Sequence, residues 1–129
     1  MDALFGELSE IEILDVWEGM SHLGNSLDLY YEALRRFCEE FDDQFTALIN
    51  TLAQEDWKNY TIRIHAFKGA FANLGAEELR ARSYDLEMAS KNGEYDKCRG
   101  KMAETGEAMK AFRDRLLNTS LMQTNTMVQ

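Results

Sequence analysis

The fold of this 129-residue chain is decided by residues 57–75, WKNYTIRIHAFKGAFANLG. Large apolar side chains recur there at steps of three and four residues, at Trp57, Tyr60, Ile64, Phe67, Phe71 and Leu74. That spacing puts them on one face of an α-helix. Gly75 then breaks the pattern, and glycine is the residue that most often follows the end of a helix. An amphipathic helix that ends at Leu74 is therefore predicted.

Helical spacing continues on both sides of this segment. Before it, Asn25 or Ser26 can cap a helix whose apolar stripe covers residues 27–52. After it, the adjacent acidic residues Glu77 and Glu78 suit the positive end of another helix. The pattern thus predicts further helices in four stretches, a short one at 11–17 and longer ones at 27–52, 77–91 and 95–116.

The absence of proline from the whole chain favours an all-α fold, because nothing interrupts the helices. Four long helices joined by short loops pack best as an up-down-up-down antiparallel four-helix bundle, with an additional short N-terminal helix at one end. The length fits one domain, which we assign to residues 1–118. Residues 119–129 lack sustained periodicity, and we expect a polar, frayed tail without a function of its own.

The composition argues against several classes of partner. With 14 Lys and Arg against 23 Asp and Glu, the net charge of −9 would repel nucleic acid. No apolar run reaches the roughly 18 residues of a membrane span, and no signal-peptide pattern is present. We therefore expect a cytoplasmic protein that does not bind membranes.

Cys38 and Cys98 stand singly among apolar positions, which predicts reduced core thiols rather than metal ligands.

A second stripe lies beside the apolar face of the central helix. His65 follows Ile64 and is rotated by about 100° from the core side, and Lys68, Gly69 and Ala72 come within the next two turns. The stripe combines a nucleophile, a permanent cation and two small residues, which together suit a phosphate. Taken singly, these residues also fit a surface histidine, a solvated lysine and a glycine at a close helix contact.

Residues 65–94, HAFKGAFANLGAEELRARSYDLEMASKNGE, resemble the signature of the histidine-containing phosphotransfer (HPt) family. That signature has a histidine, two residues and Lys-Gly, then a Gly-Ala turn and a helix with Leu-Glu-x-Ala. A looser resemblance extends over roughly residues 9–117. The resemblance implies a phosphotransfer module that relays a phosphoryl group to or from an aspartate of a receiver domain in two-component signalling. It implies no cofactor in this chain, with Mg²⁺ expected on the receiver.

The resemblance also implies a role for each residue of the motif. His65 would accept the phosphoryl group through Nε2, and Lys68 would neutralise the phosphoryl oxygens. Gly69 would leave room for the partner's active site, which agrees with its cost of roughly 1 kcal/mol inside a helix. Glu87 would hydrogen-bond the imidazole and orient it, although a solvated helix carboxylate is an equal interpretation of this residue.

Docking of the partner is expected on exposed small and apolar residues around the histidine, namely Ile62, Ala66, Ala72 and Asn73. We expect the chain to be a monomer. No glycine-rich loop after a strand is present to bind ATP, so we expect no autonomous kinase activity.

Two other classes of helical protein with a functional histidine fit poorly. A di-metal bundle needs a glutamate three residues before the histidine, and Ile62 occupies that position. The dimerisation helix of a sensor kinase has an acidic residue directly after its histidine and a proline soon afterwards, whereas this chain has Ala66 and no proline. The remaining alternative is a non-phosphorylated helical bundle that binds a signalling partner.

Overall fold

Residues 2–123 of the chain are described by the computed structural model, and within this range the fold is all-α, as predicted. In chain order the elements are α1 (Ala3–Ser9), α2 (Val16–Ser21), α3 (Leu27–Ala53), α4 (Trp57–Leu74), α5 (Glu77–Lys91), α6 (Tyr95–Leu117) and the 3₁₀-helix η1 (Ser120–Met122). None of these helices is long and apolar enough to cross a membrane.

The ends of the long helices follow from local chemistry. At the start of α3 the Ser26 hydroxyl accepts a hydrogen bond from the Leu29 amide at 3.2 Å. At the start of α4 the Asp56 carboxylate accepts one from the Asn59 amide at 3.3 Å. Gly75 ends α4 with a φ of 85°, a left-handed conformation that suits glycine. The predicted end of the helix at Gly75 is confirmed, and of the two candidate caps, Asn25 and Ser26, it is Ser26 that begins α3.

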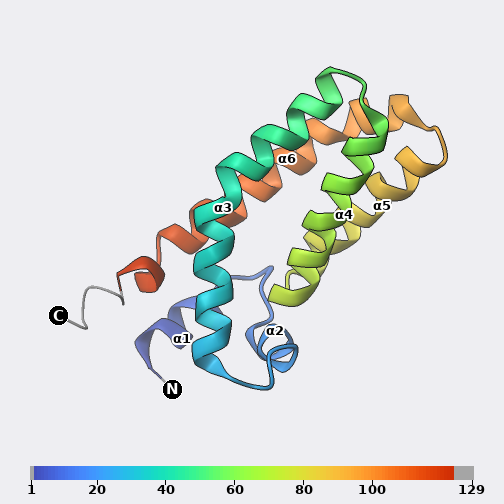
Figure 1. Ribbon diagram of the computed structural model, residues 1–129. Coiled ribbons are helices and arrows are strands. Elements are labelled where there is room, and N and C mark those ends of the chain that lie inside the picture. Colours follow the sequence, from blue (N-terminus) through green and yellow to red (C-terminus); the bar gives the residue numbers. More distant parts are fainter. Residues whose placement is uncertain (1, 124–129) are drawn as a thin grey trace.

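The four long helices, α3 to α6, form the predicted antiparallel four-helix bundle (Figure 1). Each packs against the next in sequence, and α3 also packs against α6, which closes the ring. In the core, the Phe37 ring of α3 lies 5.7 Å from Phe71 of α4 and 5.6 Å from Phe112 of α6. These contacts join three of the four helices. Burial of one such ring stabilises a fold by roughly 1.5–3 kcal/mol.

The segment before the bundle is more complex than the sequence indicates. A short helix precedes the bundle, as expected, but α1 and α2 lie on either side of a turn that includes most of the predicted stretch 11–17. Ile11 and Leu14 are buried in that turn, and their spacing of three residues imitates helical periodicity. Trp17, the last residue of that stretch, is 60% exposed and lies edge-on against Phe5.

The end of α4 is held by this N-terminal segment and by the first turn of α3. The Tyr30 hydroxyl donates a hydrogen bond to the Leu74 carbonyl at 2.7 Å, and the Asp15 amide donates to the Gly75 carbonyl at 2.9 Å. Gly19 of α2 packs directly on the same turn, where an added Cβ would lie only 2.3 Å from the Leu74 carbonyl oxygen. Close contact between α2 and α4 therefore requires glycine at this position.

The stretch after α6 differs from the frayed tail expected for residues 119–129. Leu121 of η1 is fully buried, and Arg35 of α3 donates a hydrogen bond from Nε to the Leu121 carbonyl at 2.9 Å. A single apolar residue has no period, so the sequence pattern could not show that Leu121 packs into the core. Residues 124–129 lie outside the described residues.

We predict opposite effects on stability for alanine at two helical glycines. Gly19→Ala should lower the free energy of unfolding by about 1–3 kcal/mol, because its Cβ overlaps backbone of α4. Gly100→Ala in α6 should raise it by up to about 1 kcal/mol, because its Cβ meets no atom within 4 Å. Urea denaturation of both variants measures the difference, and an unchanged Gly19→Ala protein would contradict the α2–α4 contact.

Candidate functional site

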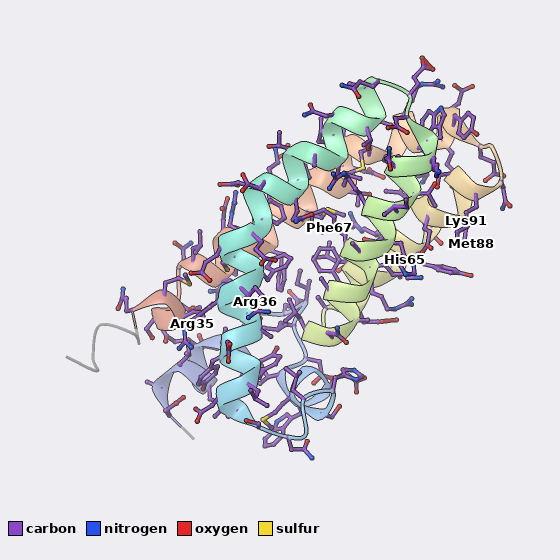
Figure 2. The ribbon with its side chains drawn as sticks, in the orientation of Figure 1. Arg35, Arg36, His65, Phe67, Met88 and Lys91 are labelled. Carbon is purple, nitrogen blue, oxygen red and sulfur yellow. The ribbon has the colours of Figure 1, made fainter. Side chains whose placement is uncertain are left out.

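The histidine of the motif stands on the side of α4 that faces α5. Ile64 is fully buried, whereas the side chain of His65, one residue further, is 62% exposed. Figure 2 shows His65 on α4 with Lys91 of α5 close by. The rotation of one residue along the helix thus carries the imidazole from the core to the edge of the α4–α5 contact.

The partner of this imidazole is a buried carboxylate on α5. His65 Nδ1 lies 2.7 Å from Glu87 Oε2, and Glu87 itself is only 1% exposed. An ionised carboxylate can only accept, so Nδ1 carries the proton of this hydrogen bond. In the neutral ring Nε2 then keeps its lone pair. The contact therefore fixes the tautomer and the ring orientation together.

Two lysines complete the surroundings of the carboxylate. Lys68 Nζ lies 2.7 Å from Glu87 Oε1, and Lys91 Nζ lies 3.0 Å from Oε2. Burial raises the pKa of Glu87, but the contacts with Lys68, His65 and Lys91 outweigh that effect and lower the pKa to about 2. Glu87 is thus a buried, ionised residue rather than a solvated helix carboxylate.

Lys68 is held from two sides. Its ammonium contacts Glu87 and lies 5.6 Å from the centre of the Tyr84 ring, a cation–π distance. Tyr84 and Lys91 were not among the residues selected from the sequence. The spacing of Glu87 and Lys91, four residues apart on one helix, is a signal that pattern analysis can use. Tyr84 carries no such signal, because its contact crosses from α5 to α4.

Gly69 lies in the open. A Cβ built on it meets no atom of the described structure within 4 Å. Packing within this chain therefore does not require glycine at this position of α4. Because Gly69 has no side chain, the backbone of α4 is accessible one turn away from His65.

The four residues expected to dock a partner differ in their exposure and in whether they line a groove. Ile62 is 57% exposed, Ala66 and Asn73 are exposed, and Ala72 is partly buried. Ala66 and Asn73 line a groove of about 500 Å³ between α3 and α4, whereas Ile62 and Ala72 do not. The apolar lining of this groove includes Phe37, Phe67 and other side chains, among them Leu29, Ala33 and Ala70.

Chemically, the site offers a nucleophilic nitrogen beside a cation on an unobstructed helix surface. Such an arrangement suits attack on an anionic electrophile, because the cation offsets the negative charge that hinders approach. Among residues 2–123, no group of three or more His, Cys, Asp and Glu side chains is placed to hold a metal ion.

Comparison with protein families identifies a match over most of the bundle. The model of the Hpt domain matches residues 32–119, which is more than half of the chain. The matched range holds most of α3 and all of α4, α5 and α6, including His65 and Glu87, and it leaves α1 and α2 outside. Comparisons with curated proteins and with solved structures gave no match.

The low pKa of Glu87 predicts a loss of stability in acid. Its pKa falls from 4.5 to about 2 on folding, so the unfolded chain binds more protons between these values. The contribution of ionised Glu87 to the free energy of unfolding is complete above pH 4.5 and disappears as the pH falls towards 2. Between pH 6 and 2, the free energy of unfolding of wild type should fall by roughly 2–3 kcal/mol more than that of Glu87→Gln. Urea denaturation at the two pH values measures the difference. Parallel losses in the two proteins would contradict a buried, ionised carboxylate.

Proposed function

Since the chain belongs to the Hpt domain family, whose members are phosphotransfer modules of two-component signalling, we propose that His65 exchanges a phosphoryl group with an aspartate of a receiver domain. The observation that carries this proposal is the 2.7 Å contact between His65 Nδ1 and the buried Glu87. One ring nitrogen is held by the protein, while the ring is exposed enough for the other to meet a partner.

The transfer is a displacement at phosphorus. The Nε2 lone pair attacks the phosphoryl group of the receiver's aspartyl phosphate, and the P–N bond forms as the P–O bond breaks. The aspartate leaves as a carboxylate. The phosphorylated ring carries a positive charge while Nδ1 keeps its proton, and the ionised Glu87 beside it offsets that charge. In the reverse step an aspartate of a receiver attacks the same phosphorus and Nε2 leaves with its electron pair.

Lys68 supplies the positive charge that the phosphoryl oxygens need. It lies on α4 one turn beyond His65, and its ammonium is close to the same carboxylate. A loose transition state is stabilised chiefly by in-line positioning and by cations, so little more is needed from this chain. The second half of the site, an aspartate with bound Mg²⁺, belongs to the receiver in this proposal.

The receiver approaches over the exposed surface of α4 that includes Ile62, Ala66 and Asn73. Open space above Gly69 supports this direction, because a partner's loop can reach the helix backbone there. The groove between α3 and α4 offers apolar surface beside Ala66, the residue that follows the histidine. We expect a transient complex of one receiver with a monomer of this chain, with a dissociation constant on the order of micromolar.

The first test is transfer from a phosphorylated receiver domain in the presence of Mg²⁺. Wild type should gain phosphate that is labile in acid and stable in base, and His65→Gln should gain none. His22→Gln is the matched control, because His22 is an exposed histidine that pairs with Glu18 on α2. It should be labelled as wild type is.

Each other outcome has a definite meaning. Labelling of His65→Gln would place the acceptor elsewhere. Absence of label on wild type with several receivers would favour a bundle that binds a signalling partner without phosphorylation.

Alanine at position 69 should separate stability from transfer. Gly69→Ala should raise the free energy of unfolding by up to about 1 kcal/mol, since alanine favours the helix and its Cβ meets no atom. It should nevertheless slow transfer, because the methyl group stands where the receiver approaches. Gly100→Ala, equally open but on α6, should gain stability without slowing transfer. Equal transfer rates in both variants would refute the role of the open surface.

A further inference from the structure

Glu87 binds more cations than the orientation of one histidine requires. Oε2 contacts both His65 Nδ1 and Lys91 Nζ, at 2.7 and 3.0 Å, whereas Oε1 contacts Lys68 Nζ at 2.7 Å. The two lysines come from different helices, Lys68 from α4 and Lys91 from α5. Each oxygen of the carboxylate therefore contacts its own lysine, and only Oε2 also contacts the histidine.

The proposed transfer makes conflicting demands on Lys68. Its ammonium neutralises Glu87 before the phosphoryl group arrives, and it must turn towards the phosphoryl oxygens afterwards. A buried carboxylate that loses its cation tends to take up a proton. A protonated Glu87 would no longer offset the charge on the phosphorylated imidazole. Until the ring gains its positive charge, a cation other than Lys68 therefore has to keep the carboxylate ionised.

We propose that Lys91 is a positioning residue that keeps Glu87 ionised and bound to His65 Nδ1 while Lys68 serves the phosphoryl group. This inference rests on the proposed function. Lys91 lies four residues after Glu87 on α5, in the favourable order of a glutamate followed by a lysine. Its contact is made within one helix, so movement of Lys68 on α4 leaves it in place.

The assignment of oxygens supports this division. When Lys68 turns away, only Oε1 loses a partner, and the two contacts of Oε2 remain. The side chain of Lys91 is 51% exposed, against 23% for Lys68, so its ammonium stays partly solvated beside the carboxylate. The charged and titratable groups within ion-pair distance of Glu87 in the described structure are Lys68 and His65 from α4 and Lys91 from α5.

The first experiment measures the pKa of Glu87 by carbon-13 NMR in the free protein. Lys68→Ala imitates the state in which Lys68 has turned away, and Lys91 should then hold the pKa below 4.5. Adding Lys91→Ala should raise the pKa by at least about one unit. Lys101→Ala, which removes an exposed lysine of α6, should leave the pKa of Lys68→Ala protein unchanged. The same pKa with and without Lys91 in that background would overturn the proposal.

The second experiment measures transfer from a phosphorylated receiver in a double-mutant cycle. Lys91→Ala should slow transfer about tenfold when Glu87 is present and less than about twofold in the Glu87→Gln background, where no carboxylate needs a cation. Lys91→Arg should restore most of the rate. Equal losses in both backgrounds would mean that Lys91 contacts the phosphoryl group or the receiver directly, and no loss in either would also overturn the proposal.

The two experiments separate this inference from the proposed function. If wild type accepts no phosphate, the proposed function fails, while the NMR titration still decides whether Lys91 can replace Lys68 as the cation of Glu87. If wild type is labelled but the cycle shows equal losses, only the inference fails.

Discussion

A carboxylate remains charged between two packed helices only when donors and cations surround it. Glu87 satisfies this condition through His65, Lys68 and Lys91, and the condition sets the register of α5 against α4. A sliding of α5 by one turn would leave the charge without its cross-helix partners. One turn away, Thr61 and Ser90 make a hydroxyl contact of 2.7 Å in the same register. The orientation of the histidine and the register of α5 against α4 therefore depend on the same carboxylate.

The family match begins within α3, at residue 32, yet residues before that position hold the end of α4 in place. Gly19 lies against the Leu74 carbonyl, and Tyr30 donates to that same carbonyl. Both positions precede residue 32, where the family match starts. The N-terminal segment thus completes the packing of the helix that carries the site. The phosphotransfer bundle of this chain includes contacts that its family signature does not describe.

Periodicity was sufficient to predict the bundle, because Ile64, Phe71 and the other buried residues repeat along single helices. It failed at Ile11 and Leu14, where a turn buries two residues at helical spacing, and at Leu121, which is buried without any repeat. The order and spacing of His65, Lys68 and Gly69 were sufficient to predict where the site lies. The buried state of Glu87 could not be predicted, because one sequence does not show which helix face meets α4.

Residues 2–123 contain two histidine–glutamate pairs, and comparison of them shows what burial adds. His22 Nε2 lies 3.1 Å from Glu18, whose side chain is 60% exposed, so water weakens the electrostatic effect of that contact. Glu87 acts on His65 from a site that is almost closed to solvent, where the same charge has a stronger effect. The first pair also occupies Nε2, whereas the second leaves it free. A buried carboxylate that binds one ring nitrogen of a half-exposed imidazole is what distinguishes His65 from the surface histidine His22.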